Sequence, residues 1–166
     1  MVGCEKDNFE SAKHVLFGMG KNIFHCGGPG TGEVAKICNN LILGINMIAL
    51  SEGLSLGEKL GIDPKVLSNI LSVSTARSWC VDTYNPRPGV LENVPASKSY
   101  NGGFQVSLIR KDLSIALEVA EQTETATKFA EHAINYYREL EKKGFGKKDF
   151  GYVYQYIHKN FEVWEK

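Results

Sequence analysis

Lys36 and Asn40 are the residues whose types and spacing best support chemistry in this chain. They follow a glycine-rich turn, 28–32, and stand four positions apart inside a helical pattern. Positions i and i+4 of a helix share one face, one turn apart. A lysine beside an amide, behind a turn open enough for a ligand, predicts that Lys36 exchanges a proton with a substrate hydroxyl. Asn40 would then hydrogen-bond Lys36 or the substrate, whereas spacing by itself favours an ordinary surface lysine.

The glycine turn Gly28-Pro29-Gly30-Thr31-Gly32 also suggests a dinucleotide-binding loop, but its context argues against that interpretation. The fingerprint G-x-G-x-x-G needs a strand, a helix and a second strand that ends in an acidic residue. Here the third glycine comes one position early, and a long helical pattern takes the place of the second strand. We interpret the turn as a hinge at which the backbone leaves one domain and enters the next helix.

The composition indicates about one globular domain. The chain has 166 residues, and 43% of them are hydrophobic, which is enough for a substantial core. Basic and acidic residues number 19 each, so the formal net charge is zero. Nucleic-acid binding would require a basic surplus on one face, and we therefore predict no nucleic-acid partner.

Cysteine and histidine spacing predicts neither a disulfide nor a metal site. The residues concerned are dispersed, without a Cys-x-x-Cys or His-Glu-x-x-His pattern: Cys4, Cys26, Cys38, Cys80, His14, His25, His132 and His158. The longest apolar run, 41–50, is shorter than the about 20 residues of a membrane span and predicts a buried core helix. The first residues show no basic or apolar leader region, so no targeting segment is expected.

Periodicity predicts an all-α fold built on one long helix. Helical patterns cover 9–16, 31–60, 64–71, 106–140 and a last helix capped by Asp149, and 22–26 is expected to be a strand. The irregular stretch 74–104 predicts an ordered loop that forms a substrate wall. The chain is expected to open without a strand, and a single strand is not stable alone. Residues 1–29 are therefore predicted to be the last helix and strand of an upstream sheet domain.

Three separated motifs resemble one enzyme family. The segment Gly30-Thr31-Gly32-Glu33-Val34-Ala35-Lys36-Ile37-Cys38-Asn39-Asn40 resembles the active-site helix of the β-hydroxyacid dehydrogenases. The segments 79–86 and 102–113 are similar to the 3-hydroxyisobutyrate dehydrogenase branch, as is the end motif 144–150. The motifs occur in the family's order and cover essentially the whole chain.

The resemblance implies specific roles for residues. It makes Lys36 the catalytic lysine, Asn40 and Asp112 substrate-binding residues, and Lys111 and Phe104 cofactor contacts, with no metal. Residues 1–29 would be the C-terminal remnant of an NAD-binding Rossmann domain, and 30–166 the helical substrate and oligomerisation domain. Family members oxidise 3-hydroxyisobutyrate to methylmalonate semialdehyde with NAD, in valine catabolism. The N-terminal domain of the family would bind most of the NAD, so this chain alone is expected to be inactive.

The same resemblance implies a small hydroxyacid substrate. The apolar run 41–50 is long for one face of a small domain, so we expect part of it to meet the neighbouring domain or a second subunit, in a homo-oligomer that is a dimer or tetramer, and its length predicts no membrane partner. The resemblance places the protein in the mitochondrial matrix of a eukaryote, or otherwise in the cytoplasm. One alternative is a related reductase of the tartronate semialdehyde or succinic semialdehyde type. A second is a non-catalytic interaction module that keeps only the dehydrogenase fold. The intact Lys36 and Asn40 pair favours an enzyme, and loop 82–86 favours hydroxyisobutyrate.

Overall fold

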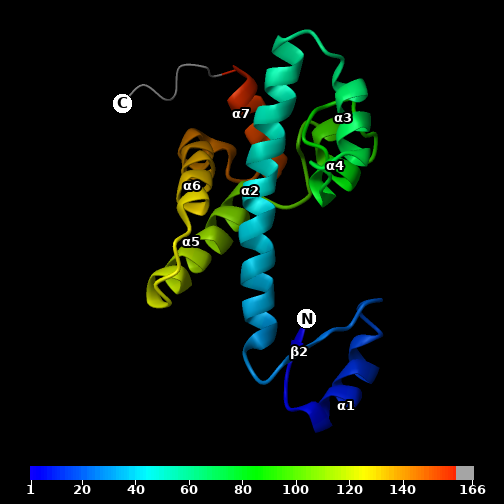
Figure 1. The fold of residues 1–166 in the computed structure, drawn as a ribbon, viewed down its shortest axis with the longest axis vertical. Helices are drawn as coiled ribbons and strands as arrows, with labels where there is room; N and C mark the ends of the chain where they lie inside the picture. Colours follow the sequence, from blue (N-terminus) through cyan, green and yellow to red (C-terminus); the bar gives the residue numbers. More distant parts are fainter. Residues whose placement is uncertain (160–166) are drawn as a thin grey trace.

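The computed structural model describes residues 1–159, so the last seven residues of the predicted domain 30–166 lie outside the described part. The fold is arranged along one helix, α2 (Thr31–Lys59), which runs through most of the molecule (Figure 1). With 29 residues it is roughly 43 Å long. The prediction of an all-α fold built on one long helix is confirmed.

A glycine with positive φ lies next to each end of α2. Thr31 Oγ1 donates to the Gly28 carbonyl oxygen at 2.7 Å, and Gly30 precedes the helix with φ 90°. The helix ends before Gly61, whose φ of 91° lies in the left-handed region that glycine tolerates. Asp63 then begins α3 (Pro64–Val73) by accepting hydrogen bonds from the backbone N–H groups of Lys65 and Val66 at 2.8 and 3.1 Å.

The core lies where other helices pack on α2. Three of them, α5 (Val106–Gln122), α6 (Lys128–Leu140) and α7 (Val153–Lys159), lie along one side, and α3 and the short α4 (Trp79–Thr83) lie near its C-terminal end (Figure 1). The fully buried core side chains include Met47, Leu54, Val106, Ile109, Leu113, Ile134, Tyr137, Leu140 and Val153. The predicted helical stretch 106–140 is two helices, because Glu124 adopts a φ of 53° between them.

α5 crosses α2 closely at Gly44. A Cβ atom at Gly44 would lie 3.1 Å from the Leu113 side chain, so the missing side chain allows the two helices to approach. Tyr137 of α6 donates its hydroxyl to the Gly44 carbonyl oxygen at 3.1 Å. A single glycine therefore sets the positions of α5 and α6 on α2.

The expectation that the chain opens without a strand is wrong. Val2–Gly3 forms β1, which pairs in parallel with β2 (His25–Gly27) across α1 (Lys6–Leu16). Val2 N–H donates to the Phe24 carbonyl oxygen at 2.8 Å. A two-residue strand is too short to show a period, so the pattern could not reveal it. A Cβ atom at Gly3 would lie 2.7 Å from the Gly28 carbonyl oxygen, so this unit contacts the turn that begins α2.

The stretch 74–104 is ordered and packs on the domain, as predicted. It contains α4 and a 3-10 turn, η1 (Pro95–Lys98). Tyr100 donates to the Pro86 carbonyl oxygen at 2.7 Å and packs edge-on against Tyr152 at 5.2 Å between ring centroids. Asp149 caps the 3-10 turn η3 (Phe150–Tyr152) that leads into α7, so the predicted cap lies one short element earlier.

α2 is long and apolar enough, by length and composition, to cross a membrane. The same properties belong to a central helix that other helices surround. Here α5, α6 and α7 pack along it, and its side chains Met47 and Leu54 are fully buried among them. One face of α2 therefore belongs to the protein core, whereas only 28% of its most apolar 18-residue stretch is buried in the part of the chain that the structure describes, so the prediction of a buried helix over 41–50 is confirmed for that face alone.

An ion pair joins the C-terminal end of α2 to the loop and to α7. Arg87 Nε and Nη2 donate to the two carboxylate oxygens of Glu58 at 2.8 and 3.2 Å, and Tyr154 donates to the same carboxylate at 2.6 Å. The Glu58 side chain is only 15% exposed. The hydrogen bond from Arg87 holds the pKa of the Glu58 carboxyl below its usual value.

The change Glu58→Gln tests this link. We expect it to lower the free energy of unfolding at neutral pH by about 1–3 kcal/mol, because Arg87 loses its charged partner. A carboxyl whose pKa is lowered by folding contributes stability above its unfolded pKa and loses it as the pH falls through the folded pKa. Urea unfolding at pH 7 and below pH 4 should therefore show a smaller acid loss in the variant than in the unmodified chain. Equal losses would contradict the link.

Candidate functional site

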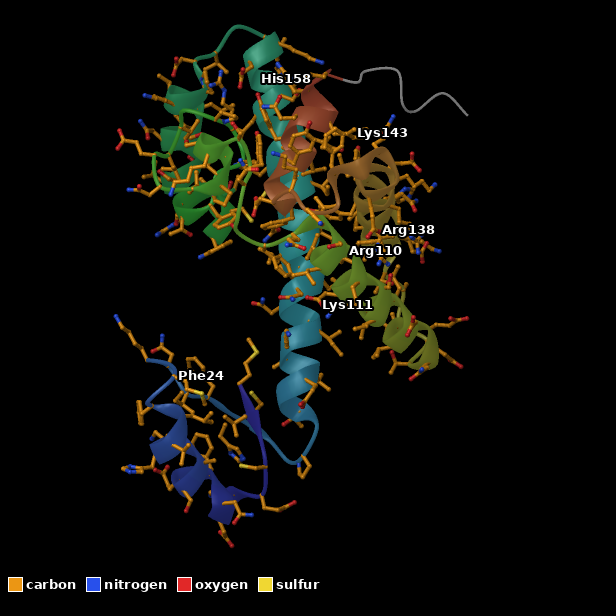
Figure 2. The ribbon with its side chains drawn as sticks, turned by 180° about the vertical axis from the view of Figure 1, so that it is seen from behind. Phe24, Arg110, Lys111, Arg138, Lys143 and His158 are labelled. Carbon is orange, nitrogen blue, oxygen red and sulfur yellow. The ribbon has the colours of Figure 1, made fainter. Side chains whose placement is uncertain are left out.

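Four residues singled out from the sequence line one pocket between α2 and α5. This pocket, of about 200 Å³, is lined by Glu33, Lys36, Ile37, Asn40, Lys111, Asp112 and Ile115. The residues come from two segments separated by more than seventy positions, and Figure 2 shows Lys111 beside α2 where α5 passes it. The predicted catalytic and substrate-binding residues are therefore brought together by the crossing of the two helices.

Lys36 lies in the second turn of α2 with an exposed side chain. Within residues 1–159 its ammonium group has no ion-pair partner closer than 4.0 Å. Its neighbours on the same face are Glu33, one turn before it, and Asn40, one turn after it. The amine is thus placed at a pocket with its proton-transfer capacity available to a ligand.

Asn40 is buried, with 9% of its surface exposed, and its amide is hydrogen-bonded at both ends. Its Nδ2 donates to Asp112 Oδ2 at 2.6 Å, and its Oδ1 accepts from Asn39 Nδ2 at 3.0 Å. The expectation that Asn40 bonds either Lys36 or the substrate is thus refined, because Asp112 takes the place of Lys36. Two contacts hold the amide in one orientation and leave its second N–H and second lone pair for a ligand.

Asp112 links Asn40 to Lys111. Its second oxygen, Oδ1, lies 2.8 Å from Lys111 Nζ, and its side chain is only 11% exposed, against 53% for the lysine. An ordinary surface pair of two solvated charges does not describe this geometry, because the Asp112 carboxylate is largely buried. The carboxylate is shared between a buried amide and a half-exposed ammonium, so it orients Asn40 while Lys111 keeps donors free.

Phe104, the other predicted cofactor contact, is not among the residues that line this pocket. Its ring packs edge-on against Phe150, at 5.7 Å between centroids, and part of its surface is exposed. Its backbone N–H donates to Asp149 Oδ2 at 2.9 Å. The Phe104 backbone thus fastens the segment that begins α5 to Asp149, while part of the residue stays exposed.

Asp149 is the buried carboxylate that organises this segment. It accepts hydrogen bonds from the Tyr84 hydroxyl at 2.7 Å, from Phe104 N–H, and from Gly151 N–H at 2.9 Å. Burial raises the pKa of the Asp149 carboxyl, and these three hydrogen bonds act in the opposite direction. One side chain thus ties the loop, the start of α5 and the last helical segment together.

Sequence reasoning missed Glu33, Ile37 and Ile115 as pocket residues. A helical-wheel reading of α2 places Glu33 and Ile37 within one turn of Lys36, so that signal was present. Ile115 lies on α5, three positions after Asp112, and only the helix crossing brings it to Ile37. The predicted substrate wall, 74–104, does not line this pocket within the described residues.

The segment 74–104 instead borders a separate hollow on α2, where Trp79 and Cys80 lie beside Asn39 and Asn46. All four cysteines are free thiols, and of these only Cys80 is buried. Burial raises the pKa of the Cys80 thiol to about 12, which makes it a packing residue. No group of three or more metal-ligating side chains occurs among residues 1–159.

Comparisons with known proteins agree on one family. Residues 30–157 match the family model described as "NAD-binding of NADP-dependent 3-hydroxyisobutyrate dehydrogenase". A Dictyostelium discoideum protein named probable 3-hydroxyisobutyrate dehydrogenase, mitochondrial, is 49% identical over 98% of this chain and 50% of its own length. A Pseudomonas aeruginosa protein named NAD-dependent L-serine dehydrogenase is 42% identical over 92% of this chain and 51% of its own length.

Structural similarity gives the same result. A solved 3-hydroxyisobutyrate dehydrogenase of Mycobacterium tuberculosis, described with L-serine, superposes with a TM-score of 0.89 and 32% identity over 95% of this chain and 54% of that one. The chain therefore spans about half the length of the relatives it matches.

Two adjacent glycines test how tightly the segments that Asp149 joins are packed around its carboxylate. Gly102 and Gly103 have φ values of 76° and 69°, but only at Gly103 would a Cβ atom overlap Asp149 and the Tyr84 hydroxyl, since nothing lies within 4 Å of the Gly102 position. We expect Gly102→Ala to lower the free energy of unfolding by about 1 kcal/mol through backbone strain. Gly103→Ala should cost roughly 2 kcal/mol more through overlap. Urea unfolding measures both, and equal losses would contradict tight packing there.

Proposed function

The chain belongs to the 3-hydroxyisobutyrate dehydrogenase family, and from this premise we propose that it is the helical, substrate-binding half of an NAD-dependent dehydrogenase. Its reaction would oxidise 3-hydroxyisobutyrate to methylmalonate semialdehyde, a step of valine catabolism. The observation that carries the proposal is the meeting of Lys36, Asn40, Lys111 and Asp112 at one pocket, where Lys36 has no ion-pair partner within the described part of the chain.

The proposal divides the chain as the sequence predicts. Residues 1–29 hold a short parallel strand pair and one helix, which suits the last part of a Rossmann domain, and 30–166 form the helical substrate domain. The relatives are about twice as long as the chain, which supports a nucleotide-binding half outside these 166 residues. On this proposal the 166 residues alone show no NAD-dependent oxidation.

Lys36 acts as the proton acceptor in the proposed mechanism. Lys36 reacts as the neutral amine: it takes the proton of the substrate hydroxyl and becomes an ammonium ion, while the carbon that bears the hydroxyl loses a hydride and the alcohol becomes an aldehyde. The amide of Asn40, fixed by Asn39 and Asp112, binds the substrate beside that amine. A fixed amide needs no reordering when the substrate arrives, which keeps the reacting hydroxyl next to Lys36.

NAD supplies the hydride acceptor when it is bound. The residues of this chain fit a contact with its exposed side rather than a complete binding site. Lys111 is half exposed and keeps donors beyond its contact with Asp112, which suits a cofactor hydroxyl or phosphate. Phe104 presents a partly exposed ring, which suits an aromatic contact with the cofactor. The other half of the protein would hold the rest of NAD.

Two further features support the rest of the assignment. A groove of about 500 Å³ between α2 and α6 is lined by apolar side chains such as Ile45, Ile48 and Phe129, and Phe129 is 79% exposed, which supports a homo-oligomer, dimer or tetramer. The word mitochondrial in the name of the Dictyostelium relative supports the mitochondrial matrix in a eukaryote, and the cytoplasm otherwise.

Related substrates remain the second candidate function. The reductases for tartronate semialdehyde and succinic semialdehyde use short hydroxyacids too, and the Pseudomonas relative is named for L-serine. A non-catalytic module is the least supported alternative, because a protein without catalytic activity would not need the hydrogen bond and ion pair that orient Asn40 through Asp112.

Turnover tests the substrate. In the dehydrogenase that contains this chain together with its nucleotide-binding half, we expect kcat/KM with NAD to be higher for 3-hydroxyisobutyrate than for glycerate or 4-hydroxybutyrate, the alcohols that correspond to tartronate semialdehyde and succinic semialdehyde. NADH absorbance measures the rates. A higher kcat/KM for another of these acids would contradict the substrate, and no oxidation of any of them would contradict the function.

Lys36→Ala tests the chemistry in the same protein. Loss of the proton acceptor should lower kcat by about 10²–10⁴-fold, the usual contribution of a positioned acid–base group. Lys59→Ala, at the far end of the same helix, is the matched control and should leave kcat within about twofold. Circular dichroism verifies that both variants fold. Undiminished kcat in Lys36→Ala would remove the lysine from the mechanism.

A further inference from the structure

We infer that Glu33 makes this pocket accept hydroxyacids that carry an ammonium group on the carbon that bears the carboxylate. Glu33 would set the preference for these acids over the analogues that carry a methyl group there. This inference rests on the proposed function, because it concerns the substrate that the same pocket binds. Glu33 has no role in the chemistry described above, although it lines the pocket directly beside the proton acceptor.

The argument starts from the charges that line the pocket. Lys111 and Asp112 neutralise each other at 2.8 Å. Glu33 and Lys36 stand three positions apart on one helix, close enough for their side chains to meet, yet no ion pair shorter than 4.0 Å involves either of them in the part of the chain that the structure describes. The pocket therefore offers one unpaired cation and one unpaired anion on successive turns.

Glu33 places a carboxylate at the start of the helix that carries Lys36. It lies in the first turn of α2, and its side chain is exposed. A carboxylate that lines a ligand pocket and has no ion-pair partner among residues 1–159 is a binding group for an ammonium ion.

Two hydroxyacids of nearly equal size separate the effect of charge from that of volume. 3-Hydroxyisobutyrate and L-serine share a carboxylate and a primary hydroxyl, and they differ at the central carbon, which bears a methyl group in one and an ammonium group in the other. Ile37 and Ile115 supply an apolar wall that suits the methyl group. Glu33 supplies the carboxylate that suits the ammonium group. The pocket can thus bind both acids, and Glu33 sets how strongly it favours L-serine, the acid with the ammonium group.

Two other roles for Glu33 make different predictions. Glu33 could hold Lys36 in its charged form, or it could stabilise the cationic nicotinamide of NAD. Either role would change the turnover of both substrates by the same factor, because Lys36 and NAD serve both reactions. The ratio of the two kcat/KM values cancels such common factors and reports only the discrimination at the central carbon.

The experiment measures kcat/KM for L-serine and for 3-hydroxyisobutyrate in the complete dehydrogenase at one NAD concentration. We expect Glu33→Gln, which keeps the shape and removes the charge, to lower the ratio of L-serine to 3-hydroxyisobutyrate about tenfold. Glu33→Asp keeps the charge and should restore most of the ratio. Glu118→Gln makes the same charge change at an exposed position of α5 outside the pocket and should leave the ratio unchanged.

The outcomes are distinguishable. A ratio that stays within about twofold in Glu33→Gln overturns the inference, whether or not both activities fall together. A ratio that falls equally in Glu118→Gln also overturns it, because the effect would then come from net charge. If the unmodified dehydrogenase oxidises neither acid, the proposed function fails, and this inference fails with it.

Discussion

The close crossing of α2 and α5 at Gly44 is the contact on which the site depends. Leu113 is fully buried against the bare backbone of Gly44. Asn40 lies one turn before Gly44 on α2, and Asp112 directly precedes Leu113 on α5. The apolar contact therefore sets the register in which the amide of Asn40 meets the carboxylate of Asp112 at 2.6 Å. A small shift of either helix would separate the two polar groups, because packed interiors do not deform continuously.

Charge is treated differently in the framework and at the pocket. The buried carboxylate of Asp149 is satisfied by three donors, and Glu58 is paired with Arg87 and Tyr154. Such groups are costly to bury unless they are hydrogen-bonded, and here they fasten distant segments together. At the pocket, Lys36 and Glu33 are exposed and have no ion-pair partner among residues 1–159. The carboxylates of Asp149 and Glu58 thus stabilise the fold, whereas Lys36 and Glu33 are placed where a ligand can contact them.

Prediction succeeded where a long regular pattern or a cap carried the signal. The helix over 31–60, its glycine stop at Gly61 and the Asp63 cap of α3 follow from local rules, because each depends only on neighbouring residues. The strand at Val2–Gly3 was not predicted, because two residues are too few to show a period. The break between α5 and α6 was not predicted either, because apolar spacing continues across it while the backbone turns at Glu124. The loop 74–104 was placed on the domain correctly, but the hollow it borders lies beside Trp79 rather than Lys36.

The sequence by itself determined the class of fold, the helix that carries Lys36 and Asn40, and the family. Those properties reside in short stretches, in which spacing and residue type decide the outcome. Only the tertiary structure decided that Asp112 is the partner of Asn40, that the Phe104 backbone bonds Asp149, and that Glu33 and Ile115 line the pocket with Lys36. Asp112 lies 72 positions from Asn40, and Asp149 lies 45 positions from Phe104. The geometry of these contacts depends on how buried side chains such as Leu113 pack, which no local pattern encodes.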